Sequence, residues 1–512
     1  MSKRFTSTIA GASILITTVG LLSKGFGFFR EIIYANSYGL ETNFDIYLIG
    51  AAIPLIINTA VFFLAQNYFI PIYHKEKNKN SIKSIDFINS SFWLFLISSI
   101  ILTSLLYFLT PLIINTYIPA AGENLKGIAS KIFTIFLATI PFNAVYAMLT
   151  SFLQAEFDFK NPAISALFQN IFIIILVYFF ENILGIYAIP IGYLIGSVVQ
   201  FLYLFAVSLR KENFRLKKFA LQTSKTWASD QFFFFIILIE VINQLYILID
   251  RYFYGRVEPG GIASLNYSSV LFGLPIAIFS LALSTAIFPQ FTKAFNNKDN
   301  ETLEGHFIKG ISMNLLVFIP IAFIFIYYGD NLIKLMYERG KFTGSDTLMT
   351  YKILRIYAFS LIFYASYAIV NKLIYGAGLV KQLLIITAGV FALKVILNFS
   401  LVGNYQQEGL AGSTTASYIS LSIIGYILVI SKLKFKSTKK FFLNIIFYSL
   451  NSLIALLIAD LFIALFPLEG LYKFILSLMI FSSLYLVNLY LIKPSEYLLI
   501  KDVFKKNVYS QL

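Results

Sequence analysis

Long apolar segments separated by short polar loops recur along nearly the whole chain. Each is roughly 20 residues or longer, the length an α-helix needs to cross a bilayer. A membrane β-barrel would show shorter segments of alternating polarity. The pattern therefore predicts an all-α polytopic membrane protein with about 14 transmembrane helices. The predicted spans are 8–33, 44–72, 87–114, 128–154, 163–180, 185–209, 229–254, 261–289, 306–328, 349–376, 381–402, 409–431, 441–466 and 470–492.

The composition supports a membrane protein and narrows the possible chemistry. Of the 512 residues, 58% are hydrophobic and 13% are charged, whereas soluble domains are about 25% charged. The chain has no cysteine, and its two histidines, His74 and His306, flank spans without metal-ligand spacing. No phosphate-binding loop of the Walker type is present. We therefore expect no catalytic residues, no metal site, no cofactor and no ATP-driven pumping by this chain.

The net charge of +15 is concentrated in alternate loops. This is the signature of membrane topology rather than of nucleic-acid binding, and it predicts that both termini are cytoplasmic. The start, Ser2-Lys3-Arg4 before an apolar run, resembles a signal peptide, but we favour an uncleaved first helix. The basic loops contain Lys75, Lys77, Lys79 and Lys83; Arg210, Lys211, Arg215, Lys217 and Lys218; Lys293 and Lys298; Lys432, Lys434, Lys436, Lys439 and Lys440; and Lys493, Lys501, Lys505 and Lys506.

The chain also repeats itself at an offset of about 220 residues, or six spans. Pro54 in the second span corresponds to Pro275 in the eighth. The second span ends in Phe69-Ile70-Pro71 and the eighth in Phe288-Pro289, each before a Lys/Asn-rich loop. Two parallel six-span halves are typical of transporters. The predicted organisation is an N-terminal lobe, 1–210; a C-terminal lobe, 226–432; two extra spans, 441–492; and a cytoplasmic tail, 493–512.

Two cations lie within the first span. A cation at mid-bilayer costs about 2.5–3.5 kcal/mol on insertion scales and normally faces a wet cavity or a partner. We expect Lys24 and Arg30 to line a cavity that attracts anions, helped by a kink at the neighbouring glycines. Glu31 shares a helix face with Lys24. The alternative is that Lys24 snorkels and that Arg30 lies at the interface.

Five polar residues in other spans are further candidates for binding or coupling: Asp45, Glu240, Asp250, Lys394 and Asn398. Asp45 could pair with Lys24 or Arg30, or cap a helix at the interface. Lys394 could supply another cation to the cavity or pair with Glu240 or Asp250. Glu240, Asp250 and Asn398 are candidates for coupling to a monovalent cation or a proton, although Asp250 could simply pair with Arg251. Asp460 has no evident role.

Several segments, taken in order, resemble the MurJ/MviN family, the lipid II flippases of the multidrug/oligosaccharidyl-lipid/polysaccharide exporter superfamily. They are Ser23-Lys24-Gly25-Phe26-Gly27-Phe28-Phe29-Arg30-Glu31, Asp45, Pro54, Phe69-Ile70-Pro71, Asp250, Leu274-Pro275, Phe288-Pro289, Arg339-Gly340-Lys341-Phe342-Thr343 with Asp346-Thr347, and Gly409-Leu410-Ala411.

The resemblance implies two six-helix lobes in a V around a cationic cavity and a groove for a lipid tail formed by the last two helices. It maps substrate-binding arginines onto Lys24 and Arg30, and a family acid onto Asp45. Two cavity arginines of the family are missing here, at Ile56-Ile57-Asn58-Thr59 and at Ser268-Ser269-Val270-Leu271. Lysine at position 24 also lacks the planar fork of arginine.

These observations together predict a flippase that moves a polyprenyl-diphosphate-linked saccharide across the bacterial cytoplasmic membrane by alternating access. The cargo is lipid II or a related lipid-linked oligosaccharide, the expected partners are that lipid and the membrane, and the expected state is a monomer. The membrane potential or a coupled cation could supply energy. The alternatives are a multidrug antiporter of the same superfamily, a membrane glycosyltransferase or glycan polymerase, and a passive scaffold.

Overall fold

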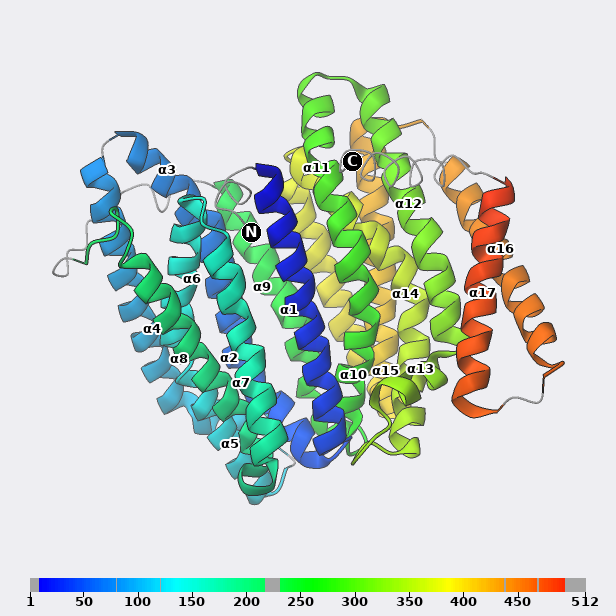
Figure 1. Cartoon of the computed structure of the whole chain (residues 1–512), viewed down its shortest axis with the longest axis horizontal. Coiled ribbons are helices and arrows are strands. Elements are labelled where there is room, and N and C mark those ends of the chain that lie inside the picture. Colours follow the sequence, from blue (N-terminus) through cyan, green and yellow to red (C-terminus); the bar gives the residue numbers. More distant parts are fainter. Residues whose placement is uncertain are drawn as a thin grey trace. The chain divides into compact units, whose positions relative to one another are not determined.

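Every regular element in the described part of the chain is a helix, as the apolar pattern predicts. The computed structural model describes residues 9–79, 81–119, 121–216, 231–436, 439–466 and 469–492 (Figure 1). The Ser2-Lys3-Arg4 start, the lysines at 217 and 218 and the predicted tail, 493–512, lie outside these ranges. Contacts divide the chain into two units, residues 1–263 with 339–343, and residues 264–338 with 344–512.

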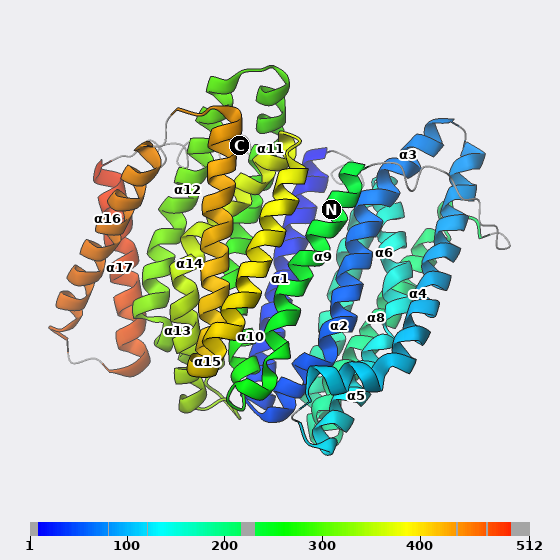
Figure 2. The same cartoon turned by 180° about the vertical axis from the view of Figure 1, so that it is seen from behind.

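The described residues of the first unit form nine α-helices with short π- and 3₁₀-helical turns between them. Its elements are α1 (Ile9–Tyr38), α2 (Thr42–Leu64), the π-turn Ala65–Phe69, α3 (Ile70–Lys79), α4 (Ser81–Tyr117), α5 (Glu123–Leu137), α6 (Ile140–Ala155), α7 (Lys160–Leu184), the 3₁₀ turn Gly185–Tyr187, α8 (Ala188–Ser208), α9 (Gln231–Tyr252) and the 3₁₀ turn Tyr254–Arg256. The helices α7 and α8 lie side by side in Figure 1, and α2 and α9 do so in Figure 2.

The second unit continues from α10, whose first residues belong to the first unit. Its elements are α10 (Gly261–Pro275), the π-turn Ile276–Ser280, α11 (Leu281–Asn296), α12 (Asn300–Tyr327), α13 (Gly329–Tyr337), α14 (Gly344–Gly376), α15 (Val380–Leu433), α16 (Lys439–Ile463) and α17 (Gly470–Ile492). The helices α16 and α17 pack against each other, and α16 packs against α12.

The helices account for the 14 predicted spans. Ten stretches of the described chain are long and apolar enough to cross a membrane. Two of these, 160–208 and 380–433, each contain two helices that fold back on one another. The remaining spans are α1 and α9, which are 30 and 22 residues long.

The internal repeat is visible in the backbone as well as in the sequence. The second and eighth spans each contain a proline followed by a π-helical turn, at Ala65–Phe69 and Ile276–Ser280. The turn between α7 and α8 has Gly185 at φ 55° and ψ −136°. The turn inside α15 has Gln406 at nearly the same angles, φ 46° and ψ −126°. Residues 185 and 406 are about 220 positions apart, which matches the offset read from the sequence.

Glycines bring the paired helices of the fifth and sixth spans into close contact. A Cβ at Gly192 would lie 2.8 Å from the Cα of Ile173, and one at Gly196 would lie 2.6 Å from the Cα of Gln169. Small residues at such crossings allow two backbones to approach closely. The sequence marks these positions in the predicted sixth span, and the structure explains why they are glycine.

The Arg-Gly-Lys-Phe-Thr segment packs with the first unit, although α13 and α14 on either side of it belong to the second. The backbone N–H of Lys341 donates to the carbonyl oxygen of Asn36 at 2.9 Å. The Lys341 ammonium lies 3.4 Å from Glu41 and 3.2 Å from Glu181. Burial lowers the pKa of Lys341, but the two carboxylates outweigh this and raise it overall.

The division by contacts differs from the lobe boundary predicted between residues 210 and 226. It falls at residue 263 because α9 packs against α2, which places the seventh span with the first unit. Contact density and internal repetition are separate criteria, so the repeat-based domain division remains a prediction.

Candidate functional site

Arg30 is the best-defined cation of the first span. Its side chain is 26% exposed. One guanidinium nitrogen donates to the Glu31 carboxylate at 2.7 Å, and another donates to the Asn170 side-chain oxygen at 3.1 Å. The guanidinium carbon also lies 5.4 Å from the centre of the Tyr34 ring. The contact with Asn170 fixes Arg30 between α1 and α7 and leaves an accessible part of the side chain.

Lys24 and Glu31 occupy different environments, although they share a helix face. Lys24 is exposed and Glu31 is buried within the described structure. Glu31 balances the charge of Arg30, and the second positive charge of this segment is that of exposed Lys24. The structure therefore contains the predicted pair of cations on α1 and shows that one of them already has a carboxylate partner.

Asp45 caps a helix instead of pairing with a cation of α1. Its carboxylate accepts hydrogen bonds from the backbone N–H groups of Gly260 and Ala263, both at 2.7 Å. Asp45 as a whole is fully buried. These N–H groups belong to the start of α10, where unpaired helix donors and the helix dipole both favour a carboxylate. The capping alternative stated for Asp45 concerned the start of its own helix, whereas the helix that it caps is α10, more than 200 residues away.

The candidates on α9 make local contacts. Gln244 donates to the Glu240 carboxylate at 2.7 Å. Asp250 is half-buried, and the adjacent Arg251 donates to the backbone carbonyl of Leu48 on α2. Gln244, one turn after Glu240, is thus its partner, whereas Arg251 connects α9 to α2.

Lys394 and Asn398 are both buried inside the second unit. Lys394 is 1% exposed and its ammonium donates to the hydroxyl of Thr414. Asn398 accepts from the hydroxyl of Ser413. Because 394 and 398 lie before the kink at Gln406 and their partners lie after it, both contacts join the two halves of α15.

Asp460, which has no evident role in the sequence, accepts a hydrogen bond from the Tyr328 hydroxyl at 2.9 Å. This contact links α16 to the end of α12. It gives Asp460 a structural role in attaching the first of the two extra helices.

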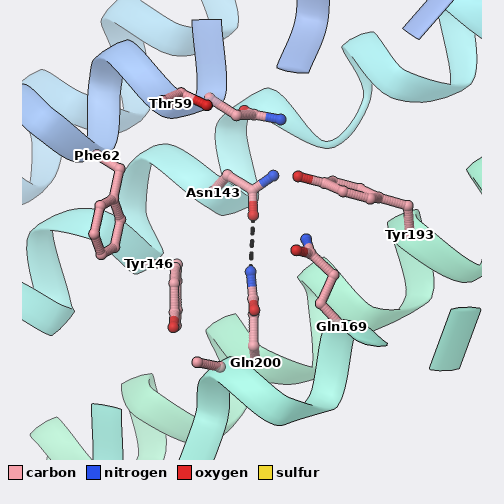
Figure 3. A pocket seen from close by; sticks show the side chains of 9 residues that line it. Thr59, Phe62, Asn143, Tyr146, Gln169, Tyr193 and Gln200 are labelled. Atoms are coloured by element: carbon pink, nitrogen blue, oxygen red, sulfur yellow. Dashed lines mark hydrogen bonds between the residues drawn. The ribbon is translucent and has the colours of Figure 1, made fainter. Parts of the chain in front are cut away.

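A polar cavity of about 250 Å³ lies within the first unit and was not recognised from the sequence. Side chains from α2, α6, α7 and α8 line it, as Figure 3 shows. Four of them are amides: Asn58, Asn143, Gln169 and Gln200. Amides at mid-span in four helices were the available signal, since polar groups are costly in a bilayer. Because the four amides lie far apart in the sequence, no local motif indicates that they form a cluster.

Comparison with known proteins identifies the family. A sequence profile described as "Lipid II flippase MurJ" matches residues 39–484. The chain belongs to the lipid II flippase MurJ family. Among its relatives, the "Probable lipid II flippase MurJ" of Borreliella burgdorferi is 26% identical over 484 residues, covering 93% of this chain and 90% of that protein. The "Lipid II flippase MurJ" of Thermosipho africanus is 26% identical over 452 residues, covering 88% of this chain and 90% of that protein.

Solved structures support the same fold. The chain is similar to a structure titled "Lipid II flippase MurJ, inward closed conformation", with a TM-score of 0.78, 24% identity, and 93% of this chain and 97% of that chain covered. An inward-facing multidrug transporter of the MATE family matches less well, with a TM-score of 0.65, 15% identity, and coverage of 82% and 98%. Family membership and the apolar helices make the chain a multi-pass inner-membrane protein of a transporter family.

Proposed function

We propose that this chain flips lipid II, or a closely related polyprenyl-diphosphate-linked saccharide, from the cytoplasmic to the outer leaflet. Family membership supports the class of cargo, since the profile and the curated relatives carry the name of lipid II flippases. The observation that carries the proposal is the position of Arg30, a partly exposed guanidinium on a membrane-spanning helix. A charged group in a membrane span normally faces a partner or a water-filled cavity and is by default a candidate functional residue.

The environment of Arg30 suits a diphosphate. Guanidinium groups bind phosphate oxygens through paired, charge-assisted hydrogen bonds. Glu31 occupies part of the guanidinium now, so an arriving diphosphate would compete with that carboxylate. Exposed Lys24 lies less than two turns away along α1 and adds the charge needed to favour the diphosphate. The sugars would cross in the wet interior while the polyprenyl tail stays in lipid.

The driving force and orientation belong to the same proposal. The basic loops support an orientation with both termini in the cytoplasm. An anionic head group that leaves a negative cytoplasm gains about 2.3 kcal/mol per charge for each 100 mV of membrane potential. A cation coupled through Glu240, Asp250 or Asn398 is the other source of energy. The protein would act as a single chain without a cofactor.

The test uses the purified full chain in liposomes with fluorescent lipid II, an O-antigen-type lipid-linked unit and a fluorescent phosphatidylethanolamine. Translocation is measured with a membrane-impermeant quencher, with and without an imposed potential or sodium gradient. We expect lipid II to move and phosphatidylethanolamine to remain. The double variant Lys24→Ala/Arg30→Ala should be slower by at least about tenfold, since charge-assisted hydrogen bonds contribute about 1.5–3 kcal/mol each.

A matched double variant controls for the loss of two positive charges. Lys381→Ala/Lys432→Ala removes two exposed lysines at the ends of α15 and should transport like the wild type. Equal transport by the α1 variant and this control would contradict the anion site. Equal movement of lipid II and phosphatidylethanolamine would contradict the proposed cargo, and export of a cationic dye in place of lipid II would favour the multidrug antiporter.

A further inference from the structure

The amide-lined cavity of the first unit contains hydrogen-bonding groups that the protein does not use. Gln200 donates to the side-chain oxygen of Asn143 at 2.8 Å, as Figure 3 shows. The side-chain nitrogen of Asn143 has no hydrogen-bond partner, although Asn143 is only 8% exposed. Asn58 donates to Thr139 at 3.1 Å, and its side-chain oxygen also has no partner. The Asn143 nitrogen and the Asn58 oxygen are therefore a buried donor and a buried acceptor without a protein partner, on two side chains that line the cavity.

Leaving such groups unsatisfied is costly, so their position indicates what the cavity accepts. A buried polar group without a partner costs about 1–3 kcal/mol. One free donor and one free acceptor in the same cavity suit a ligand whose groups can do both, as hydroxyl and amide groups do. A monovalent cation would require oxygen ligands, and the donor nitrogen of Asn143 opposes it.

The rest of the lining supports a neutral ligand. None of the nine residues around the cavity is acidic or basic, and three of them carry aromatic rings: Phe62, Tyr146 and Tyr193. In Figure 3 the hydroxyl of Tyr193 points towards the Asn143 amide. A few convergent polar groups beside aromatic rings are the usual pattern of a binding pocket for a neutral molecule. Hydroxyl groups of a sugar ring can bond to the amides while its C–H faces contact the rings.

The size of the cavity limits the occupant to a small group. Its volume of about 250 Å³ exceeds by several fold the ~30 Å³ that one water molecule occupies in the liquid. It is smaller than the ~300–1,000 Å³ of pockets that enclose drug-sized ligands. One sugar ring fits these bounds, and a complete head group of two sugars and a peptide does not.

The cavity adjoins the residues that hold Arg30. Gln169 lines the cavity, and Asn170, the next residue of α7, accepts the hydrogen bond from Arg30. Gly196 brings α8 against the backbone of Gln169, and an electrostatic interaction connects Arg30 with Tyr193. Adjacent residues of α7 therefore contact Arg30 and line the cavity.

We propose that the cavity binds the first sugar ring of a lipid-linked saccharide, the ring attached directly to the diphosphate. The inference rests on the proposed function, because it takes Arg30 as the diphosphate site. It adds a neutral saccharide subsite formed by Asn58, Asn143, Gln169 and Gln200, and it makes the cavity the part of the protein that distinguishes a glycosylated lipid from its bare diphosphate.

The experiment compares two competitor lipids on the full chain in nanodiscs that contain a fluorescent undecaprenyl diphosphate probe. One competitor is undecaprenyl diphosphate, and the other carries a single N-acetylated sugar on the diphosphate. We expect the wild type to prefer the glycosylated lipid by roughly tenfold, the effect of one or two hydrogen bonds. The variant Asn143→Leu/Gln200→Leu should lose this preference and keep its affinity for the bare lipid. Because the double variant removes both partners of the Asn143–Gln200 hydrogen bond, neither residue is left as a buried polar group without a partner.

A second variant and a control separate binding from folding. Ala166→Leu fills the cavity without removing a polar group, because Ala166 is part of its lining, and it should also abolish the preference. The control Gln66→Leu/Gln154→Leu removes a similar amide pair from the same unit, with a nitrogen–oxygen distance of 3.4 Å and no part in the lining. It should retain the wild-type preference, and all variants should elute and unfold like the wild type.

The outcomes distinguish the cavity from the diphosphate site. If folded Asn143→Leu/Gln200→Leu and Ala166→Leu proteins both keep the preference, the cavity does not bind the sugar and the inference is overturned. An affinity that follows the sodium concentration, with no preference between the lipids, would make the cavity a cation site and also overturn it. If the wild type binds neither lipid, the proposed function fails first and the saccharide subsite falls with it.

Discussion

Arg30 in the first unit and Lys394 in the second are both cations on membrane-spanning helices, but their surroundings differ. Arg30 has a carboxylate, an amide and an aromatic ring around it and remains 26% exposed. Lys394 is 1% exposed, and its ammonium contacts a hydroxyl from the other half of the same helical hairpin. A cation can bind a ligand only where part of its surface is accessible. We therefore propose anion binding for Arg30 and a structural role for Lys394.

The largest expected effect comes from replacing Lys394. These variants test whether its charge acts on the substrate. Lys394→Ala should destabilise the protein by about 2–4 kcal/mol, because it leaves a cavity and removes the contact with Thr414. Lys394→Met fills the same space without charge and should stay within about 1.5 kcal/mol of the wild type. Denaturant unfolding and lipid II transport are measured on both. A stable Lys394→Met protein that does not transport would show that the charge itself is functional.

Removing the carboxylate beside Arg30 tests whether Glu31 competes with an anionic ligand for the guanidinium. Glu31→Gln should strengthen binding of an anionic lipid by about fivefold, since the guanidinium loses its competitor and the site gains one net positive charge. Lipid binding is measured against a neutral phospholipid, whose affinity should not change. Weaker binding of the anionic lipid would show that Glu31 orients Arg30 more than it competes for it.

The turn in α15 provides a smaller effect. Gln406 has φ 46° and ψ −126°, a conformation suited to glycine, which occupies the corresponding turn at Gly185. Gln406→Gly should stabilise the protein by about 1 kcal/mol and recover part of the loss in Lys394→Ala, because both changes act on one hairpin. Thermal unfolding of the single and double variants measures this. Gly185→Gln is the matched reverse change and should be destabilising.

The smallest effect concerns a contact near the end of α6. Burial raises the pKa of Glu156, but hydrogen bonds from Lys77 and Tyr73 outweigh it and leave the pKa below its usual value. The stabilisation is present above about pH 4.5, the usual value, and is lost as the pH falls through the lower folded-state pKa. Unfolding followed from pH 6 to pH 3 should be less pH-dependent in Glu156→Gln. An unchanged profile would contradict this assignment, and transport at pH 7 should be unaffected.

The sequence predicts the architecture well because a bilayer demands long apolar helices. It placed the seventh span at 229–254, and the structure has α9 at Gln231–Tyr252. It also gave the repeat offset that relates Gly185 to Gln406. It could not decide between ion pairing and helix capping for Asp45, because the N–H groups that bind it come from residues 260 and 263. Such long-range contacts have no local pattern.

The candidate site was predictable only in part, for the same reason. The cost of charge in a membrane singled out Lys24, Arg30 and Lys394, but it did not show which of them is accessible. That distinction depends on packing, which placed Thr414 against Lys394. The sequence does not indicate the amide cavity, because a single amide is tolerated in a membrane span. Only the meeting of four helices makes the amides a cluster.

The most direct test of the account is the affinity of the Arg30→Lys protein for undecaprenyl diphosphate and undecaprenyl monophosphate in nanodiscs. Lysine keeps the charge but loses the planar fork that grips two oxygens. We predict that Arg30→Lys binds the diphosphate about tenfold more weakly than the wild type, with the monophosphate nearly unchanged and unfolding unaltered. Wild-type affinity for the diphosphate in a folded Arg30→Lys protein would contradict the assignment of Arg30 as the diphosphate site.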